Sequence, residues 1–299
     1  MTLSESFQQW YAIGSTFQYK NHDENHAIFY KNEGVGDAML CLHGFPTASW
    51  DWYRVWDDLT ARCQVIATDM LGFGYSDKPR RHTYSILEQA DIHEALLQHL
   101  GIKRVHIFAH DYGDTVAQEL IARHNDGKLS FEILSVCLLN GGLFPETHHP
   151  RPIQKLLLTP VLGTIIARFF NRKAFARIFI PIFGANTKPT EGELDEFWQL
   201  IDQHNGRVII NKLLHYMPER VTHRERWVAA LQKATCPLML IDGIDDPVSG
   251  GHMADRYIEL IPHPNVTRLE GIGHYPQVEA PQRVLAAYLE FLEPLLKSD

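Results

Sequence analysis

The feature that most constrains the fold is an alternation of short apolar runs with longer amphipathic stretches. Near-continuous hydrophobicity is typical of strands that are covered on both faces, as in a parallel sheet. The stretches between the runs have helical periodicity, so the alternation predicts a doubly wound, mostly parallel and twisted α/β sheet with helices on both faces. The runs are residues 38–42, 65–68, 105–109, 134–139, 237–241 and 266–269.

Two earlier stretches and one helix can be outlined more closely. Residues 16–20 and 27–31 alternate in polarity, and we expect them to form an antiparallel pair at the edge of the sheet. Residues 84–100 fit a helix, and Ser85 followed by Glu88 three residues later is typical of a capping box at a helix start.

The alternation breaks after Gly142 and resumes at Pro237. In between, the pattern is helical and is interrupted by prolines at positions 150, 152, 160, 181 and 189. We expect a helical cap, or lid, at residues 143–227, inserted into a core made of residues 1–142 and 228–299. Such a lid would cover the carboxyl edge of the sheet, where open α/β sheets bind ligands.

Composition excludes several classes of function. The 299 residues suffice for one large domain or for one domain with an insertion. A net charge of −8 and the lack of a basic patch argue against a nucleic-acid partner. No apolar run approaches the ~20 residues that span a bilayer, and the N-terminus has no features of a secretory signal. We therefore expect a cytoplasmic protein without a membrane anchor, and the sequence leaves its oligomeric state open.

The four cysteines fit the same compartment. Cys41 and Cys137 lie inside apolar runs, and Cys63 and Cys236 lie just before such runs. Buried free thiols suit a reducing cytoplasm. No CxxC, HExxH or GxGxxG spacing occurs, so neither a metal nor a cofactor is expected.

A carboxylate stands at the corner between one apolar run and the next helical stretch. Residues 109–113, Ala-His-Asp-Tyr-Gly, fit the spacing of a nucleophile elbow, with Asp111 in place of the usual serine. Small residues are needed on both sides because the chain reverses sharply there. Amide donors at the helix start favour an ionised Asp111 that points into a pocket. The alternative is an aspartate that only caps the helix. Asp114, one turn later, could cap the helix or line the site.

The loop after the first run supports the elbow. Residues 38–42 lead into His43-Gly44-Phe45-Pro46, where the glycine allows a close approach of the backbone. The amides of Phe45 and Tyr112 would then form an oxyanion hole. We expect His43 and His110 to brace the loops around it rather than to act as bases.

The other members of a catalytic set follow the last two runs. Asp245 and Asp246 come after residues 237–241, and a carboxylate just past a strand suits the residue that orients a histidine. The spacing of glycine, two residues and aspartate favours Asp246, with Asp245 as the alternative. Asn140, which ends the run before the lid, cannot stabilise an imidazolium by charge. His274 follows the last run, so the chain order is nucleophile, acid, histidine.

Five segments of the chain resemble a known family. The sequence is similar to the mesoderm-specific transcript proteins, in the epoxide hydrolase and haloalkane dehalogenase branch of the α/β-hydrolase superfamily. The resemblance runs from about residue 38 to 290 and is weaker in the lid. Vertebrate members of that family are membrane-associated; we expect no anchor in this chain, so we do not carry that property over to it. The segments are HGFPTASWDWYRVW, DMLGFGYSDKPRRHTYSILEQADIHEALLQHLG, HDYGDTVAQEL, NGGLFPETHHP and GHYPQVEAP.

The resemblance implies an α/β-hydrolase fold and a hydrolase with an aspartate nucleophile. Asp111 would attack an electrophilic carbon and form an alkyl-enzyme ester. Neutral His274, oriented by Asp246, would then activate water against that ester. Attack by a carboxylate on a substrate ester would give an anhydride. A small to medium apolar epoxide is therefore the expected substrate, with a haloalkane or another α/β-hydrolase substrate as the alternative.

The groups that stabilise the leaving group separate epoxide from halide chemistry. Epoxide hydrolases that resemble this chain use two lid tyrosines as proton donors, whereas dehalogenases have tryptophan where Tyr112 stands here. Tyr216 is the only tyrosine in residues 143–227 and is placed like one of the two. Trp198 or His215 could replace the missing donor, or could belong to the lid core. A further alternative is a non-catalytic fold that binds an apolar ligand or a partner protein.

Overall fold

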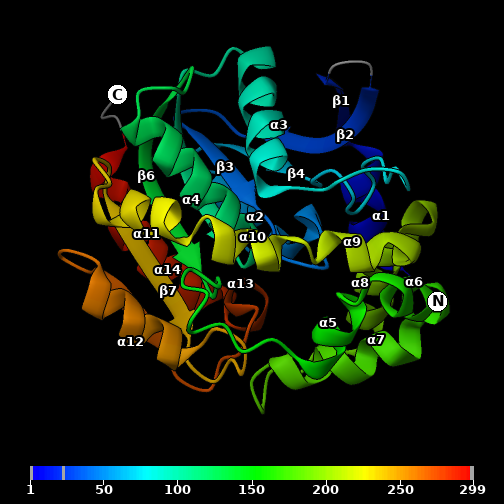
Figure 1. The fold of residues 1–299 in the computed structure, drawn as a ribbon. Helices are drawn as coiled ribbons and strands as arrows, with labels where there is room; N and C mark the ends of the chain where they lie inside the picture. The colour runs from blue at the N-terminus through cyan, green and yellow to red at the C-terminus, as the bar shows by residue number, and fades with distance from the viewer. Residues whose placement is uncertain (1–2, 22–23, 297–299) are drawn as a thin grey trace.

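The protein forms an eight-stranded sheet with helices on both faces (Figure 1). The computed structural model describes residues 3–21 and 24–296, and the strand order within them is β1-β2-β4-β3-β5-β6-β7-β8. The strands are β1 (Ser15–Asn21), β2 (Glu24–Glu33), β3 (Ala38–Leu42), β4 (Gln64–Thr68), β5 (Arg104–His110), β6 (Glu132–Leu139), β7 (Leu238–Gly243) and β8 (Val266–Leu269).

Each apolar run of the sequence lies in a strand of the parallel part of the sheet. In the part of the sheet with the order β4-β3-β5-β6-β7-β8, each strand is parallel to its neighbours. The strand β2 is antiparallel to both of its neighbours, β1 and β4. Every residue of β3 is buried, as expected for a strand that is covered on both faces. The predicted α/β sheet and its antiparallel edge pair are confirmed.

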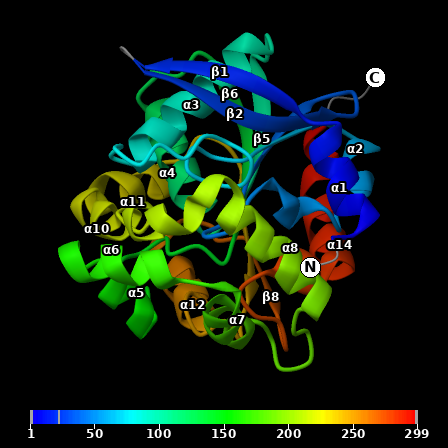
Figure 2. The ribbon, with the colours of Figure 1, turned by 90° about the vertical axis from the view of Figure 1, so that its right-hand side faces the viewer.

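The helices cover the sheet from two sides, and Figure 2 shows the sheet between them. On one side lie α3 (Ile86–His99), α4 (Tyr112–Asn125) and α11 (Arg224–Gln232). On the other side lie α1 (Glu5–Ala12), α2 (Trp56–Thr60) and α14 (Pro281–Leu292). Near β7 and β8 are α12 (Gly251–Leu260) and α13 (Pro276–Glu279).

Half of the predicted capping box is present at the start of α3. The hydroxyl of Ser85 accepts a hydrogen bond from the amide of Glu88 at 3.1 Å. The side chain of Glu88 instead contacts His82 and Asn21, at 2.6 Å and 3.2 Å. The helix start is therefore capped from one direction only.

Helices fill the chain between β6 and β7. Two of the prolines begin helices, as Pro152 does in α5 and Pro160 in α6, because a proline at the first helical position needs no partner for a backbone N–H. The division into core and cap stays a prediction, and its boundary at residues 227 and 228 falls inside α11. In Figure 1, α5 to α9 lie at the right, α10 lies near the centre and α11 lies at the left beside α4. They are α5 (Pro152–Leu157), α6 (Pro160–Phe169), α7 (Arg172–Phe179), α8 (Glu191–Asp202), α9 (Ile210–Leu213), α10 (Tyr216–Thr222) and α11.

The cysteines belong to the interior. All four are free thiols, of which Cys41, Cys63 and Cys137 are buried and Cys236 is partly buried. Burial raises the pKa of Cys41 and Cys137 well above its ordinary value, so these thiols are not reactive nucleophiles.

Candidate active site

The chain turns sharply at Asp111, between the end of β5 and the start of α4. Its backbone has φ 45° and ψ −101°, a conformation that residues with a side chain rarely adopt. Gly113 permits the turn because a Cβ atom there would lie 2.3 Å from the carbonyl oxygen of Leu42 on β3. Strain of this kind costs about 1–3 kcal/mol and clusters at functional sites. Asp111 therefore lies at an elbow of the predicted kind.

Backbone amides adjoin the carboxylate of Asp111. The N–H of Phe45 donates to its Oδ2 atom at 3.1 Å. Gly44 makes this approach possible, since a Cβ there would lie 2.5 Å from Nδ1 of His110. Tyr112 is the first residue of α4, and the first N–H groups of a helix have no partner inside it. The two amides predicted for the oxyanion hole thus both border residue 111.

His274 connects Asp111 with a buried acid. Its Nδ1 lies 2.7 Å from Oδ2 of Asp246, and its Nε2 lies 3.7 Å from Oδ2 of Asp111. Asp246 is 2% exposed, whereas the neighbouring Asp245 is exposed to solvent. The backbone amide of Ser249 donates to Asp246 at 3.0 Å. Of the two candidate acids, Asp246 is the one beside the histidine.

Asn140 joins the loops that follow β6 and β7. Its amide nitrogen donates to Oδ2 of Asp246 at 3.2 Å and to the carbonyl of Gly243 at 3.0 Å. Asn140, which is uncharged and was not expected to be the acid, thus supports Asp246 by hydrogen bonding.

The charges of the three groups depend on one another. Burial alone would raise the pKa of Asp111, but the hydrogen bond and charge of His274, followed by the charge of Arg220, hold it well below its ordinary value. Burial alone would lower the pKa of His274, but Asp246 and Asp111 raise it well above its ordinary value. The free site therefore holds an ionised Asp111.

Arg220 was not predicted from the sequence. It lies on α10 and is 2% exposed, with Nη2 3.1 Å from the carbonyl oxygen of Asp111 and 3.6 Å from its Oδ1. Its Nε donates to the hydroxyl of Thr115 at 2.7 Å, and its Nη1 is buried without a partner among the described residues. A lone arginine in a helical pattern gives no sequence signal that it will reach a residue 109 positions away.

Asp114 faces β6 rather than the cavity. Its Oδ1 accepts a hydrogen bond from the amide of Leu139 at 3.4 Å. Burial, reinforced by the charge of Asp111, raises the pKa of Asp114 well above its ordinary value. A Cβ on Gly141 would lie 2.2 Å from its Oδ2.

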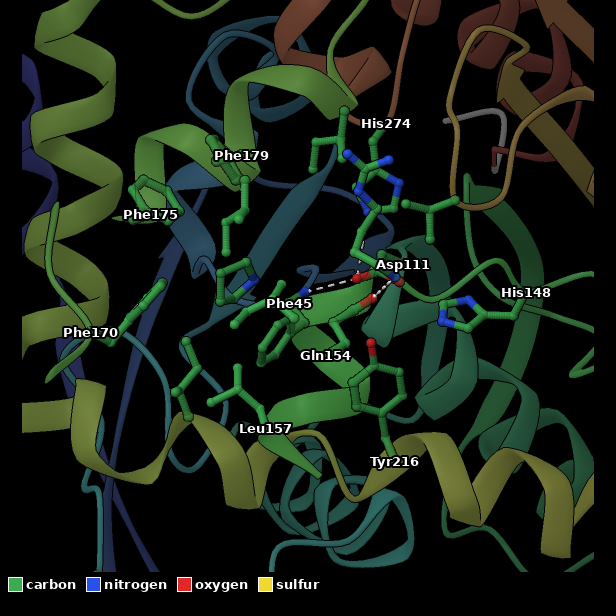
Figure 3. A pocket seen from close by; sticks show the side chains of 17 residues that line it. Phe45, Asp111, His148, Gln154, Leu157, Phe170, Phe175, Phe179, Tyr216 and His274 are labelled. Carbon is green, nitrogen blue, oxygen red and sulfur yellow. Dashed lines mark hydrogen bonds and ion pairs between the residues drawn. The ribbon is translucent and has the colours of Figure 1, made fainter. Parts of the chain in front are cut away.

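A cavity opens in front of Asp111 and His274 (Figure 3). Tyr216 reaches it from α10, and its hydroxyl points toward Asp111 in Figure 3. Burial and the charge of Asp111 raise the pKa of Tyr216, so its hydroxyl keeps its proton. His148, Arg151 and Gln154 add polar groups to the lining. The rest of the wall is apolar and comprises Phe45, Pro46, Ile153, Leu157, Phe170, Phe175, Ile178, Phe179, Ile182, Ile210 and Val248.

The two residues proposed to replace the second tyrosine lie elsewhere. Trp198 packs against Phe170 and Phe175, at ring distances of 5.7 Å and 6.0 Å, and lies outside the described lining of the cavity. The prediction that Trp198 binds substrate is therefore corrected to a packing role, because its neighbours separate it from the cavity. His215 is exposed at the start of α10. His148, which was not predicted from the sequence, does line the cavity.

Two histidines brace the loops, as expected. Nδ1 of His43 lies 2.8 Å from the carbonyl of Gly44, and its Nε2 accepts the amide of Met70 at 3.0 Å. Burial lowers the pKa of His43 to about 3. Nε2 of His110 lies 2.7 Å from the carbonyl of His274, which fixes the backbone of that residue.

Potential metal ligands occur away from the cavity. Ligand atoms of Glu24, His26 and His82 lie within 4.8 Å of one another. These groups contact each other, with Glu24 3.1 Å from His26 and 3.2 Å from His82.

The part of the chain that the structure describes has no helix both long and apolar enough to cross a bilayer.

Comparison with known proteins identifies the family. Residues 37–281 match the model of the alpha/beta hydrolase fold family. The mesoderm-specific transcript protein of Mus musculus is 44% identical, over 97% of this chain and 89% of its own length. Two solved structures share the fold. The epoxide hydrolase CorEH has a TM-score of 0.76 at 21% identity, covering 94% of this chain and 99% of its own. A haloalkane dehalogenase DbeA-M1 loop variant from Bradyrhizobium elkanii has a TM-score of 0.75 at 21% identity, covering 94% and 97%.

Sheet order, elbow and sequence similarity agree. The chain belongs to the α/β-hydrolase fold family and, within it, to the family of the mesoderm-specific transcript proteins.

Proposed function

We propose that the protein is a hydrolase in which Asp111 attacks a carbon atom, most like an epoxide hydrolase acting on an apolar epoxide. The observation that carries the proposal is the carboxylate of Asp111 held between the amide of Phe45 and His274, at the wall of a cavity. Carboxylate attack on an ester would give an anhydride. An aspartate in this position suits carbon electrophiles that expel oxygen or halide.

In the first step, one oxygen of Asp111 bonds to a ring carbon of the epoxide while the carbon–oxygen bond of the ring breaks. Oδ1 suits this attack because Oδ2 already accepts the amide of Phe45. The released oxygen takes the proton of the Tyr216 hydroxyl, and solvent later returns a proton to Tyr216. The product of this step is a hydroxyalkyl ester on Asp111.

In the second step, Nε2 of His274 takes a proton from water, and the water oxygen attacks the ester carbon of Asp111. Negative charge develops on Oδ2, where the amides of Phe45 and Tyr112 stabilise it. The bond between that carbon and the alkyl-bearing oxygen then breaks. This oxygen takes the proton held by His274, so a diol leaves. The second hydrogen of the water stays on the carboxyl group of Asp111 and is released to solvent as a proton, which restores the carboxylate and balances the proton returned to Tyr216.

Alkylation itself prepares His274 to act as a base. In the free site, the charges of Asp246 and Asp111 raise the pKa of His274 against the effect of burial. The ester removes the charge of Asp111, so the pKa of His274 falls in the intermediate. A neutral imidazole is then available at the step that needs it.

The cavity walls favour an apolar substrate. Phe170, Phe175 and Phe179 line it together with aliphatic side chains. Burying the alkyl part of a substrate against such walls contributes roughly 25 cal/mol for each Å² removed from water. The hydroxyl of Tyr216 favours an oxygen leaving group, and the described lining contains no tryptophan that could hold a halide.

The test uses the His274→Gln variant, which cannot hydrolyse the ester. We expect a terminal epoxide to label Asp111 covalently in this variant, detected by peptide mass spectrometry, and the wild type to release diol. Asp111→Asn is the matched control and should form no adduct. Labelling by the terminal bromide of the same chain length, but not by the epoxide, would point to a dehalogenase. Apolar-ligand binding without any adduct would point to a non-catalytic fold.

A further inference from the structure

His148 brings two unpaired ring nitrogens to the cavity. It lies between β6 and α5, where the chain passes from the sheet into the inserted helices. Its Nδ1 and Nε2 are both buried, and neither has a hydrogen-bond partner among residues 3–21 and 24–296. In Figure 3, His148 lies beside Asp111 on the side opposite Phe175, with Tyr216 on the adjacent side.

Unpaired buried nitrogens need a physical explanation. Polar atoms in protein interiors nearly always have a hydrogen-bond partner, because an unpaired one loses its interaction with water and gains nothing in return. An oxygen atom of a ligand at this end of the cavity would supply the missing partner of His148. Tyr216 reaches the same end with a hydroxyl that points toward Asp111.

The charge state of His148 makes it a donor similar to a tyrosine. Burial, and then the positive charge of Arg220, lower the pKa of His148 to about 3. The ring is neutral at neutral pH and carries one N–H group, which can donate a hydrogen bond to an oxygen.

The backbone next to His148 is anchored to the loop after β7. The amide of His149 donates to the carbonyl of Val248 at 3.1 Å. Gly142 leaves room for the side chains of Arg220 and His148. A Cβ atom on Gly142 would lie 2.4 Å from Nη1 of Arg220 and 3.0 Å from Nδ1 of His148. A donor held in advance loses little entropy when substrate binds.

We propose that His148 is a catalytic residue that donates a hydrogen bond to the oxygen released from the attacked carbon, as the partner of Tyr216. This rests on the function proposed above and names the donor that the single lid tyrosine leaves missing. Tyr216 gives its proton to the oxygen, and the N–H of His148 stabilises the negative charge that develops there. The pair selects substrates with an oxygen leaving group over haloalkanes.

The experiment separates the two chemical steps in a single turnover. Enzyme in excess is mixed with a terminal epoxide and quenched at intervals, and mass spectrometry follows the formation and decay of the Asp111 adduct. We expect His148→Phe to slow adduct formation by roughly tenfold or more, because it removes a donor to the leaving oxygen, and to leave adduct decay unchanged. His148→Gln keeps an N–H donor and should recover much of the rate.

The neighbouring His149 provides the matched control. It is exposed, its ring stacks on that of His252, and it lies outside the described cavity lining, so His149→Phe should change neither step. Thermal unfolding of each variant confirms that it folds. Unchanged adduct formation in His148→Phe, or equal slowing of both steps, would overturn the role of His148 while the proposed function stands. If epoxide forms no adduct with the wild type or with His274→Gln, the proposed function fails and this inference with it.

Discussion

The guanidinium of Arg220 lies against Asp111 although the two residues are 109 positions apart in the chain. Its Nη2 is 3.1 Å from the carbonyl oxygen of Asp111 and 3.6 Å from Oδ1, and its carbon is 4.5 Å from the ring centre of Tyr216. The inserted helices thus bring a positive charge to Asp111. We expect this charge to help keep the carboxylate of Asp111 ionised.

Replacing Arg220 tests this relationship. Arg220 helps His274 to lower the pKa of Asp111 against burial, so Arg220→Met should raise that pKa. The rate of adduct formation should fall at low pH as Asp111 becomes protonated, and we expect this acidic limb of the pH profile to move to higher pH in Arg220→Met. Below the pKa, each unit of pKa changes the ionised fraction of Asp111 about tenfold. Arg220→Lys should shift the limb less. Arg177→Met, on the exposed face of α7, is the control, and an acidic limb that stays in place in Arg220→Met would contradict the role of its charge.

The route of the water oxygen distinguishes a covalent mechanism from direct attack by water. In a single turnover in heavy-oxygen water, the label should enter the carboxylate of Asp111, because the oxygen delivered to the first product comes from the enzyme. Peptide mass spectrometry of Asp111 and mass analysis of the diol provide the measurement. Label in the diol alone would show that Asp111 acts as a base instead.

Asp246 and Asp245 form a natural matched pair. Asp246 is buried and 2.7 Å from His274, whereas Asp245 is exposed. We expect Asp246→Asn to slow adduct hydrolysis by on the order of 10³–10⁴-fold, because the imidazole loses the charge that stabilises its protonated form. Adduct formation, which needs no base, should change much less. A similar loss in Asp245→Asn would contradict the assignment.

The buried Asp242 predicts a dependence of stability on pH. Burial, reinforced by the charge of Asp246, raises its pKa to about 8, and both carboxyl oxygens are buried without a hydrogen-bond partner in the described chain. Between its unfolded pKa near 4 and about 8, the folded state binds more protons than the unfolded state, so this group lowers stability as pH rises. Asp242→Asn should remove that loss.

Denaturant unfolding at several pH values measures the effect. The free energy of unfolding of Asp242→Asn relative to wild type should increase with pH by up to about 1.4 kcal/mol per unit across this window. Asp58→Asn, at an exposed position on α2, is the control. A difference between Asp242→Asn and wild type that does not vary with pH would contradict the prediction.

Two glycines should respond in opposite directions to alanine. At Gly113, a Cβ would lie 2.3 Å from a backbone oxygen of β3, so Gly113→Ala should lower the free energy of unfolding by about 1–3 kcal/mol and distort the elbow. At Gly192 in α8, the nearest atom to a Cβ is 4.0 Å away, so Gly192→Ala should stabilise the helix by roughly 0.5–1 kcal/mol. Thermal and denaturant unfolding check both, and a stable Gly113→Ala would contradict the close approach.

The sequence by itself determined the parallel sheet, its antiparallel edge and the elbow at Asp111. These features are local: a strand covered on both faces reads as an unbroken apolar run, and a sharp turn needs small residues at fixed spacing. The chain order also predicted that His274 and an aspartate would follow the last strands, because the carboxyl ends of parallel strands share one edge.

Only the tertiary structure decided which groups surround Asp111. It buried Asp246 beside His274 and left Asp245 exposed, placed Trp198 against Phe170 and Phe175, and brought His148 to the cavity and Arg220 to Asp111. Helical periodicity indicates which face of a helix is buried, but the side chain it meets depends on how the inserted helices pack against the sheet. Contacts across more than a hundred residues leave no local pattern.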